Sequence, residues 1–251
     1  MRYVGFGARR LSKGIHVMTG CFDTKLFGRE CHTHLSAYLV CGEHGSLLVD
    51  TGHTKDFHRI AAYVHSVVGP NLTYIFPTHE EYPHAGNLGL LLDAFPDVVV
   101  VGETRNYHLY YPDQYKRERF LQKHVGDRID LGGRSLKVLP AAIRDLPSYW
   151  AYDDLDHTLF VSDGFAFSHF DPKECIMLSN ELPNQPTANE ARLVLDLALY
   201  WSRHTDNRKL VTELHEMLGE YDTKVICPAH GSVITDPGQM LAVMDEALIG
   251  S

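Results

Sequence analysis

The stretch THEEYPHAG, residues 78–86, joins an apolar segment to a predicted helix. Residues 72–77 before it have the composition of a buried strand, and residues 87–95 after it have the pattern of a short helix. The side chains of His79, Glu81 and His84 therefore follow a strand end on one turn. Such a turn can aim several side chains at one point, which is how proteins hold transition-metal ions. A glutamate between two histidines favours iron over the all-histidine shell of hydrolytic zinc sites.

Two other predicted strands end directly before a residue that can bind metal. Asp163 follows the strand predicted at residues 158–162, and His230 follows the strand predicted at residues 224–227. In open α/β sheets, sites gather at the carboxyl ends of strands, so these side chains and those of the first turn can converge. Each residue alone is weak evidence, because a single aspartate or histidine after a strand is more often a turn residue or a helix cap.

Strand and helix patterns alternate along much of the chain, which predicts a sheet with helices outside it. No linker or repeat marks a boundary, so we expect a single domain over residues 1–251. Strands are expected at residues 14–21, 35–42, 46–50, 74–76, 98–101 and 134–139, and helices at residues 56–68, 106–125, 189–204, 208–221 and 236–248.

Composition narrows the classes of partner and compartment. The net charge of -9 argues against nucleic acid and anionic membranes as partners. No apolar run approaches the roughly 18 residues of a transmembrane helix, and residues 1–10 lack the apolar core of a signal peptide. The cysteines number 5, an odd count without a C-x-x-C pair. We therefore expect a reduced, cytoplasmic protein.

In their order and separation, these motifs resemble those of the metallo-β-lactamase superfamily. The matching segments are residues 50–52, 78–86, 160–165 and 228–231, and the likeness extends over residues 14–235. The resemblance implies an α/β fold, a four-layer αββα sandwich of two mixed β-sheets between helices. It also places a metal site along one edge of the sandwich.

The glutamate at position 81 separates this chain from the hydrolases of that superfamily. Those carry H-x-H-x-D-H, whereas this sequence carries H-x-E-x-P-H. The glutamate is similar to that of flavodiiron proteins and stand-alone oxygen-binding diiron proteins, whose motif is H-x-E-x-D-H. These relatives bind two iron ions and bind or reduce dioxygen or nitric oxide. With 251 residues and no room for a flavodoxin domain, the chain resembles the stand-alone kind.

Carried over by position, the resemblance implies five of the family's seven metal ligands. His79 and Glu81 would bind the first iron, His84 and His230 the second, and Asp163 would bridge the two.

Two positions depart from the family pattern. Pro83 replaces an aspartate ligand, and Arg144 replaces a histidine ligand with a permanent cation that cannot bind metal. Each iron would lose one protein ligand. The second site would keep His84, His230 and Asp163, two histidines and one carboxylate, which is the facial triad of non-haem iron oxygenases.

Residues near these motifs supply candidates for catalysis. Arg144 would either pair with Glu81 or Asp145, or clamp an anionic substrate through two hydrogen bonds. Tyr82 would act as a hydrogen-bond donor or a phenolate ligand. A satisfied side chain without metal contact is the alternative for Tyr82 and for the other neighbours that could complete the ligand set, namely His32, His34, His169, Tyr149 and Tyr152. Aromatic residues around the motifs indicate either core packing or an apolar pocket for an organic substrate.

The leading hypothesis is a non-haem iron protein with two iron ions that binds or activates dioxygen. It would be an oxidoreductase, an oxygenase or an oxygen-binding protein, with zinc or manganese as alternative metals. Dioxygen or nitric oxide and a small organic substrate are the expected partners, and the resemblance implies a homodimer. A metal-dependent hydrolase of phosphodiesters, lactones or thioesters is disfavoured by Pro83 and Arg144, because a hydrolase usually needs an aspartate at the former position. The third alternative is an inactive binding module that keeps the fold.

Overall fold

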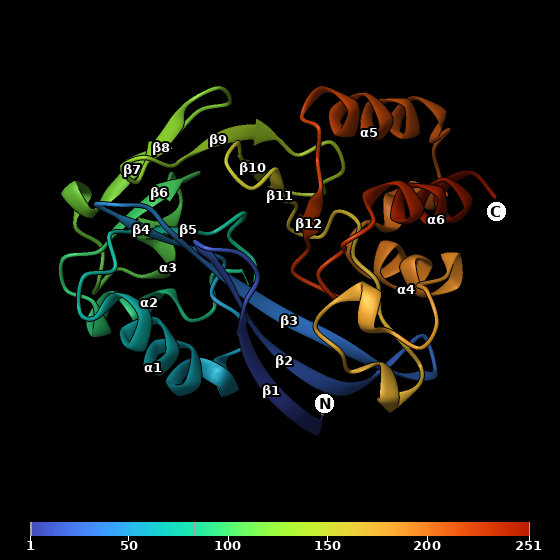
Figure 1. Cartoon of the computed structure of the whole chain (residues 1–251), viewed down its shortest axis with the longest axis horizontal. Coiled ribbons are helices and arrows are strands. Elements are labelled where there is room, and N and C mark those ends of the chain that lie inside the picture. Colours follow the sequence, from blue (N-terminus) through green and yellow to red (C-terminus); the bar gives the residue numbers. More distant parts are fainter. Residues whose placement is uncertain (1, 83, 251) are drawn as a thin grey trace.

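The computed structural model describes residues 2–82 and 84–250. Two β-sheets lie against each other, with helices α1 to α3 beside one sheet and α4 to α6 beside the other (Figure 1). No helix in these two stretches is both long and apolar enough to cross a bilayer.

The first sheet has its seven strands in chain order from β1 to β7. Strands β1 to β4 pair antiparallel, and β4 to β7 pair parallel. The pairing between β2 and β3 is the longest and extends this end of the sheet well beyond the rest (Figure 1). The strands are β1 (Arg2–Arg10), β2 (Ile15–Leu26), β3 (Arg29–Cys41), β4 (Ser46–Val49), β5 (Tyr74–Phe76), β6 (Val99–Gly102) and β7 (Phe120–Gln122).

The second sheet has five strands in the order β12-β11-β10-β9-β8. Only the β11–β12 pairing is parallel, so this sheet is also mixed. Its strands are β8 (Arg128–Asp130), β9 (Ser135–Pro140), β10 (Tyr149–Asp153), β11 (Thr158–Phe160) and β12 (Val225–Cys227).

Along a strand, side chains alternate between the core between the two sheets and the core between that sheet and its helices, because neighbouring residues of a strand point to opposite faces. On β4, Leu47 and Val49 enter the core between the sheets, whereas Leu48 packs beneath α1 and α2. On β10, Trp150 packs beneath α4 to α6, whereas Ala151 faces the core between the sheets. The predicted four-layer αββα sandwich is therefore confirmed.

Side-chain caps begin helices α4 and α6. At the start of α4, the Thr187 hydroxyl accepts from the Glu190 amide while the Glu190 carboxylate accepts from the Thr187 amide, which forms a capping box. At the start of α6, the Asp236 side chain accepts from the Gln239 amide. The helices are α1 (Phe57–Val68), α2 (Leu88–Ala94), α3 (Tyr107–Tyr110), α4 (Ala188–Ala198), α5 (Arg208–Glu220) and α6 (Pro237–Ile249), and short 3-10 turns lie at Thr54–Asp56, Arg117–Arg119, Pro172–Glu174, Ser179–Glu181 and Tyr200–Arg203.

The helix predicted at residues 106–125 is wrong. This stretch forms only the single turn of α3, a 3-10 turn and the strand β7. The Arg119 guanidinium donates to the carbonyls of Leu92, Phe95 and Val98 at 3.0–3.2 Å, and β7 pairs parallel to β6. These tertiary hydrogen bonds outweigh a local helical preference worth only tenths of a kcal/mol per residue. The strands β1, β8 and β10 were not predicted.

Candidate metal centre

The candidate ligands come from loops that follow three short strands. His79, Glu81 and His84 follow β5, whereas Asp163 and His230 follow the parallel neighbours β11 and β12. The Ala229 amide donates to the Ser162 carbonyl at 2.8 Å, and the Tyr149 amide donates to the Thr78 carbonyl at 2.9 Å. These hydrogen bonds join the loops, so side chains from both sheets meet at one edge of the sandwich.

Asp163 lies at the centre of this cluster. Its Oδ1 is 3.3 Å from Nε2 of His84 and 3.3 Å from Nε2 of His230. Its Oδ2 is 3.7 Å from Nε2 of His79, and that nitrogen is 3.8 Å from Oε2 of Glu81. One oxygen of the carboxylate thus faces His84 and His230, and the other faces His79. Ligand atoms that share a cation about 2 Å away are separated by about 3–4 Å, so these distances suit a metal site.

Burial leaves polar atoms of the cluster without hydrogen-bond partners. His79 and His84 are 5% and 1% exposed, and the Asp163 side chain is 13% exposed. Nε2 of His79 and Oδ1 of Asp163 are buried and make no hydrogen bond, although both lie at ion-pair distance from neighbours. Unpaired buried polar atoms are costly, and a cation between them would satisfy both. The residues present therefore fit a metal, although Glu81 is largely exposed, at 63%.

Asp50 fixes the orientation of His84. Its Oδ2 lies 2.9 Å from Nδ1 of His84, and its Oδ1 accepts from the amide and hydroxyl of Thr78 at 2.7 and 2.8 Å. A hydrogen bond from Nδ1 leaves Nε2 free to bind a metal. From the sequence, residues 50–52 were predicted only as part of the family motif, with no role for Asp50 at the metal site. Its signal was present, because Asp50 ends a buried strand beside the one that precedes the histidines.

The other two histidines are oriented in the same way. Nδ1 of His79 lies 2.9 Å from the Ser162 hydroxyl, and Nδ1 of His230 lies 3.1 Å from the His34 carbonyl oxygen. Ser162 has a positive φ of 53°, a rare conformation for a non-glycine residue, and it immediately precedes Asp163. In all three imidazoles, Nδ1 thus lies at hydrogen-bond distance from a protein oxygen, and Nε2 points toward the Asp163 carboxylate.

The electrostatics of the cluster favour a cation. Burial by itself would lower the pKa of His84, but the carboxylates of Asp50 and Asp163 outweigh it and raise this pKa to about 10. Burial would raise the pKa of Asp163, yet His84 and His230 hold it well below its usual range. Burial lowers the pKa of His79 to about 3. Carboxylates on two sides of one imidazole create a negative potential that a bound cation would offset.

The two predicted catalytic residues lie at the border of the cluster. Arg144 is exposed and borders a small cleft with His79 and Asp163, and its Nη1 donates to the Ala141 carbonyl at 2.8 Å. The Tyr82 side chain is half-exposed, and its hydroxyl lies 3.2 Å from both the amide and the hydroxyl of Thr54. Pro83, which was predicted to remove a ligand, lies outside the described residues.

The neighbouring histidines and Tyr152, which were considered as additional metal ligands, do not join this cluster. His32, His34 and His169 pack against one another, with ring centroids 5.1–5.5 Å apart. The Tyr152 hydroxyl bonds to the Tyr221 carbonyl beneath α5. Most of the nearby aromatic residues pack in the core, as the plainer interpretation expected: Trp150, Tyr152, Phe165 and Phe167.

A cavity of about 360 Å³ opens above the cluster. Its floor includes His84, Asp163 and His230, and Glu81 and Tyr82 stand at its side. Its other walls are largely apolar and come from β2, β3 and α4: Leu26, Leu35, Val194, Leu197 and Ala198. A mostly apolar cavity with a few convergent polar groups is typical of small-molecule sites.

The sequence model of the Metallo-beta-lactamase superfamily matches residues 34–230, most of the chain. The chain belongs to this superfamily. The resemblance inferred from the motifs is thus confirmed.

The chain is also similar to curated proteins and to solved structures over most of its length. The Coenzyme F420H2 oxidase of Methanothermobacter marburgensis is 29% identical over 93% of this chain, which spans 59% of the oxidase. The rubredoxin oxygen:oxidoreductase of Desulfovibrio gigas superposes on 96% of the chain with a TM-score of 0.76, at 18% identity and over 61% of its own length. The flavodiiron protein of Giardia intestinalis superposes on 98% of the chain with a TM-score of 0.73, at 17% identity and over 60% of its length. The chain thus spans about three fifths of these relatives.

Proposed function

We propose that this protein is a non-haem diiron oxidoreductase that binds or reduces dioxygen or nitric oxide. The observation that carries the proposal is the division of the Asp163 carboxylate, whose Oδ1 faces His84 and His230 while its Oδ2 faces His79. A carboxylate placed in this way can bridge two ions. The names of the similar proteins, an F420H2 oxidase and an oxygen:oxidoreductase, support the choice of an oxidative reaction over hydrolysis.

The donor set suits iron. His79 and Glu81 would hold one ion, His84 and His230 the other, and Asp163 both. Mixed imidazole and carboxylate ligands with open positions are typical of non-haem iron, and the bound iron would supply electrons and open coordination positions for a diatomic molecule.

The surrounding residues would prepare the cavity for this reaction. Leu35, Val194 and Leu197 line one side with carbon, which keeps bulk water away and admits a diatomic molecule or a small organic substrate. The Tyr82 hydroxyl at the cavity side would donate a hydrogen bond to a bound ligand. Arg144 borders a separate small cleft beside His79 and Asp163, where it would hold an anionic group of a substrate that reaches that side of the cluster.

We further propose that residues 1–251 act as one domain and that two copies associate. Both sheets contribute to a shared core, in which Val49 and Phe76 of one meet Val138 and Phe160 of the other. Separate folding of either sheet would expose this core. Light scattering coupled to size-exclusion chromatography will measure the number of copies, and a mass of one chain would reject the dimer.

Metal analysis and oxygen uptake test the function together. Protein reconstituted with Fe(II) without air is expected to bind two irons per chain and to consume dioxygen when a chemical reductant is added. The Asp163→Asn variant should lose both properties. His215→Ala is a matched control, because His215 is an exposed histidine on α5 that pairs with Asp245.

Three results would reject the proposal. The first is iron binding that Asp163→Asn leaves unchanged. The second is stoichiometric zinc or manganese with turnover of a phosphodiester, lactone or thioester and no oxygen uptake, which would favour a hydrolase. The third is a protein that binds none of these metals and whose melting temperature is unaffected by a chelator, which would favour an inactive binding module.

A further inference from the structure

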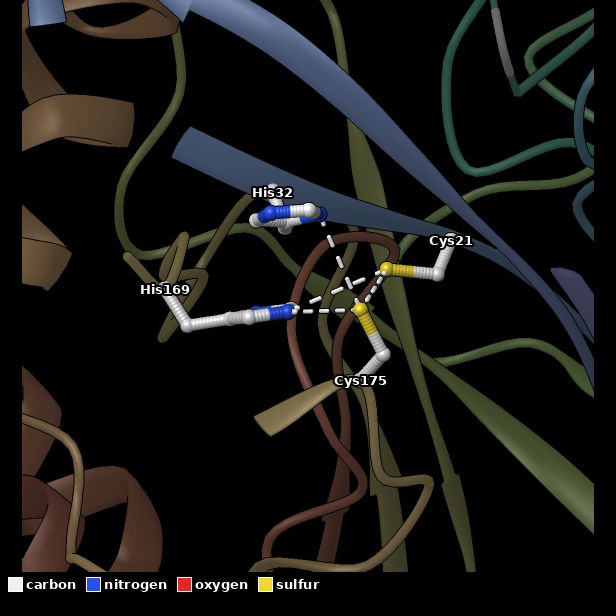
Figure 2. A group of neighbouring side chains, drawn as sticks. All are labelled: Cys21, His32, His169 and Cys175. Atoms are coloured by element: carbon white, nitrogen blue, oxygen red, sulfur yellow. Dashed lines mark hydrogen bonds between the residues drawn. The ribbon is translucent and has the colours of Figure 1, made fainter. Parts of the chain in front are cut away.

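A second group of metal-binding side chains lies apart from the Asp163 cluster. Cys21 belongs to β2 and His32 to β3, whereas His169 and Cys175 belong to the segment that follows β11 (Figure 2). This segment is held against β3 by two backbone hydrogen bonds between His32 and His169, at 2.7 and 3.0 Å. Residues separated by up to 154 positions thus meet on a hydrogen-bonded scaffold.

The four side chains point toward one another. The Cys175 Sγ lies 3.3 Å from Nε2 of His169 and 3.7 Å from Nδ1 of His32. The Cys21 Sγ lies 3.8 Å from the same nitrogen of His169 and 2.7 Å from the Cys175 Sγ. The two imidazole rings are stacked, with both sulfurs at the same edge of the stack (Figure 2). All four ligand atoms lie within 4.8 Å of one another.

We propose that Cys21, His32, His169 and Cys175 form a second metal site, which binds Zn²⁺ through two thiolates and two imidazoles. Tetrahedral zinc has bonds of about 2.3 Å to sulfur and about 2.0 Å to nitrogen, so its ligand atoms lie roughly 3.3–3.8 Å apart. The three sulfur–nitrogen distances above fall in this range. Binding requires the two sulfurs to separate by about 1 Å, and the thiol protons leave to solvent as the metal–sulfur bonds form.

The electrostatics of the pair prepare one thiolate. The hydrogen bond from Cys21 lowers the pKa of Cys175 to about 5, against the opposing effect of burial, and His169 lowers it further. The same hydrogen bond, with burial, raises the pKa of Cys21. The hydrogen bond thus favours the thiolate at Cys175, and a thiolate is the form that binds metal.

A disulfide is the competing fate of two such cysteines. Both are free thiols in this structure, with their sulfurs 2.7 Å apart, whereas a disulfide bond is about 2.05 Å long. A disulfide would also give no role to the two imidazole nitrogens that face the sulfurs. A cavity of about 430 Å³ reaches Cys21 and Cys175 between β1 and Met177, which gives an ion a path to the site.

The proposed zinc site would clamp the segment beside the Asp163 cluster. The Phe167 amide donates to the His230 carbonyl at 3.4 Å, and the Ser168 amide donates to the Glu190 carbonyl at 3.2 Å. These two residues directly precede His169. Zinc bound at His169 and Cys175 would therefore fix the backbone that contacts His230. Its role is structural, because four protein ligands leave no open position for a substrate.

Cobalt substitution tests this site separately from the first one. Protein freed of metal and titrated with Co²⁺ is expected to show a thiolate-to-cobalt charge-transfer band, which the Asp163 cluster cannot give because it contains no cysteine. Zn²⁺ should displace the cobalt at one equivalent per chain. The band should persist in Asp163→Asn and disappear in Cys21→Ser and Cys175→Ser. Cys41→Ser, which removes a free, partly buried cysteine elsewhere, should retain it.

Two measurements guard against variants that fail to fold. His32→Ala and His169→Ala remove imidazoles and keep both sulfurs, and each should weaken zinc binding by more than the roughly 10–100-fold that loss of a ligand's outer partner costs. In the unsubstituted protein, zinc should protect Cys21 and Cys175 from alkylation and leave Cys41 reactive. A cobalt spectrum without the thiolate band, or a Cys21–Cys175 disulfide in protein purified under reducing conditions with zinc, would overturn the proposal.

Discussion

Replacement of Asp50 by asparagine tests how much the orientation of His84 contributes to metal binding, because it leaves every proposed metal ligand in place. Asp50 is 2% exposed and accepts hydrogen bonds from the Thr78 amide and hydroxyl, while its other oxygen faces Nδ1 of His84 at 2.9 Å. Asparagine has nearly the same shape and can still accept both bonds from Thr78. Its amide nitrogen, however, is a donor where the second carboxylate oxygen was an acceptor.

The size of the effect follows from this single lost interaction. A hydrogen bond to a charged group contributes about 1.5–3 kcal/mol. With asparagine, Nδ1 of His84 must accept instead of donate, which moves the proton to Nε2 and blocks the atom that faces Asp163. At about 1.4 kcal/mol for each tenfold change in affinity, Asp50→Asn should weaken metal binding by roughly 10–150-fold. In known metal sites, loss of a hydrogen-bond partner of a metal ligand lowers the metal affinity by a similar factor of roughly 10–100.

Competition with a coloured chelator will measure the affinity for Fe(II), and thermal unfolding will show that the variant remains folded. Asp236→Asn is the control, because Asp236 caps α6 and asparagine caps a helix equally well. An Asp50→Asn protein that folds and binds Fe(II) as tightly as the unsubstituted protein would refute the assignment of His84 as a ligand through Nε2.

Three further substitutions test the fold around the centre. Trp150→Ala should lower the free energy of unfolding by about 3–5 kcal/mol in chemical denaturation, because Trp150 is fully buried beneath α4 to α6; a change below about 1 kcal/mol would contradict this packing. Thr187→Ala removes the hydroxyl that caps α4, keeps the bond from the backbone amide to Glu190, and should cost about 1 kcal/mol, with an unchanged stability as the contrary result. Burial would raise the pKa of Asp196, but Arg203 and Arg192 lower it below its ordinary value, so its stabilising effect is present above about pH 4 and is lost as pH falls through the lowered pKa. Asp196→Asn should therefore be destabilising at pH 7, with a difference from the unsubstituted protein that shrinks toward pH 2; a difference independent of pH would refute the ion-pair explanation.

Local sequence patterns predicted much of the fold because most helices and strands here form where their own residues favour them. β5 lies within the apolar run that predicted it, and α1 and α5 begin within one residue of their predicted starts. The stretch at residues 106–125 failed because its structure depends on hydrogen bonds from Arg119 to carbonyls in a different part of the chain. No local pattern contains that information.

The same distinction applies to the candidate centre. The order of strand ends predicted that His79, His84, Asp163 and His230 would approach one another, and the structure places them together. The partners that orient them were not predicted, because a hydrogen bond such as the one between His84 and Asp50 depends on side-chain directions across strands. The Cys21 and Cys175 thiols are another example, since no spacing rule links cysteines so far apart in the chain.

The shortness of β5, β11 and β12 has a consequence for how an ion would be received. Each has three residues, and a one-residue slip between β11 and β12 would move His230 by about 3.3 Å and turn its strand's side chains to the opposite face. Phe160 and Cys227 are paired in register and buried between the sheets, so such a slip would also expose apolar surface to water. The apolar core between the sheets thus sets the spacing of the imidazoles before any ion binds. The metal would therefore bind a preformed site, and little of its binding energy would be used to fold the chain.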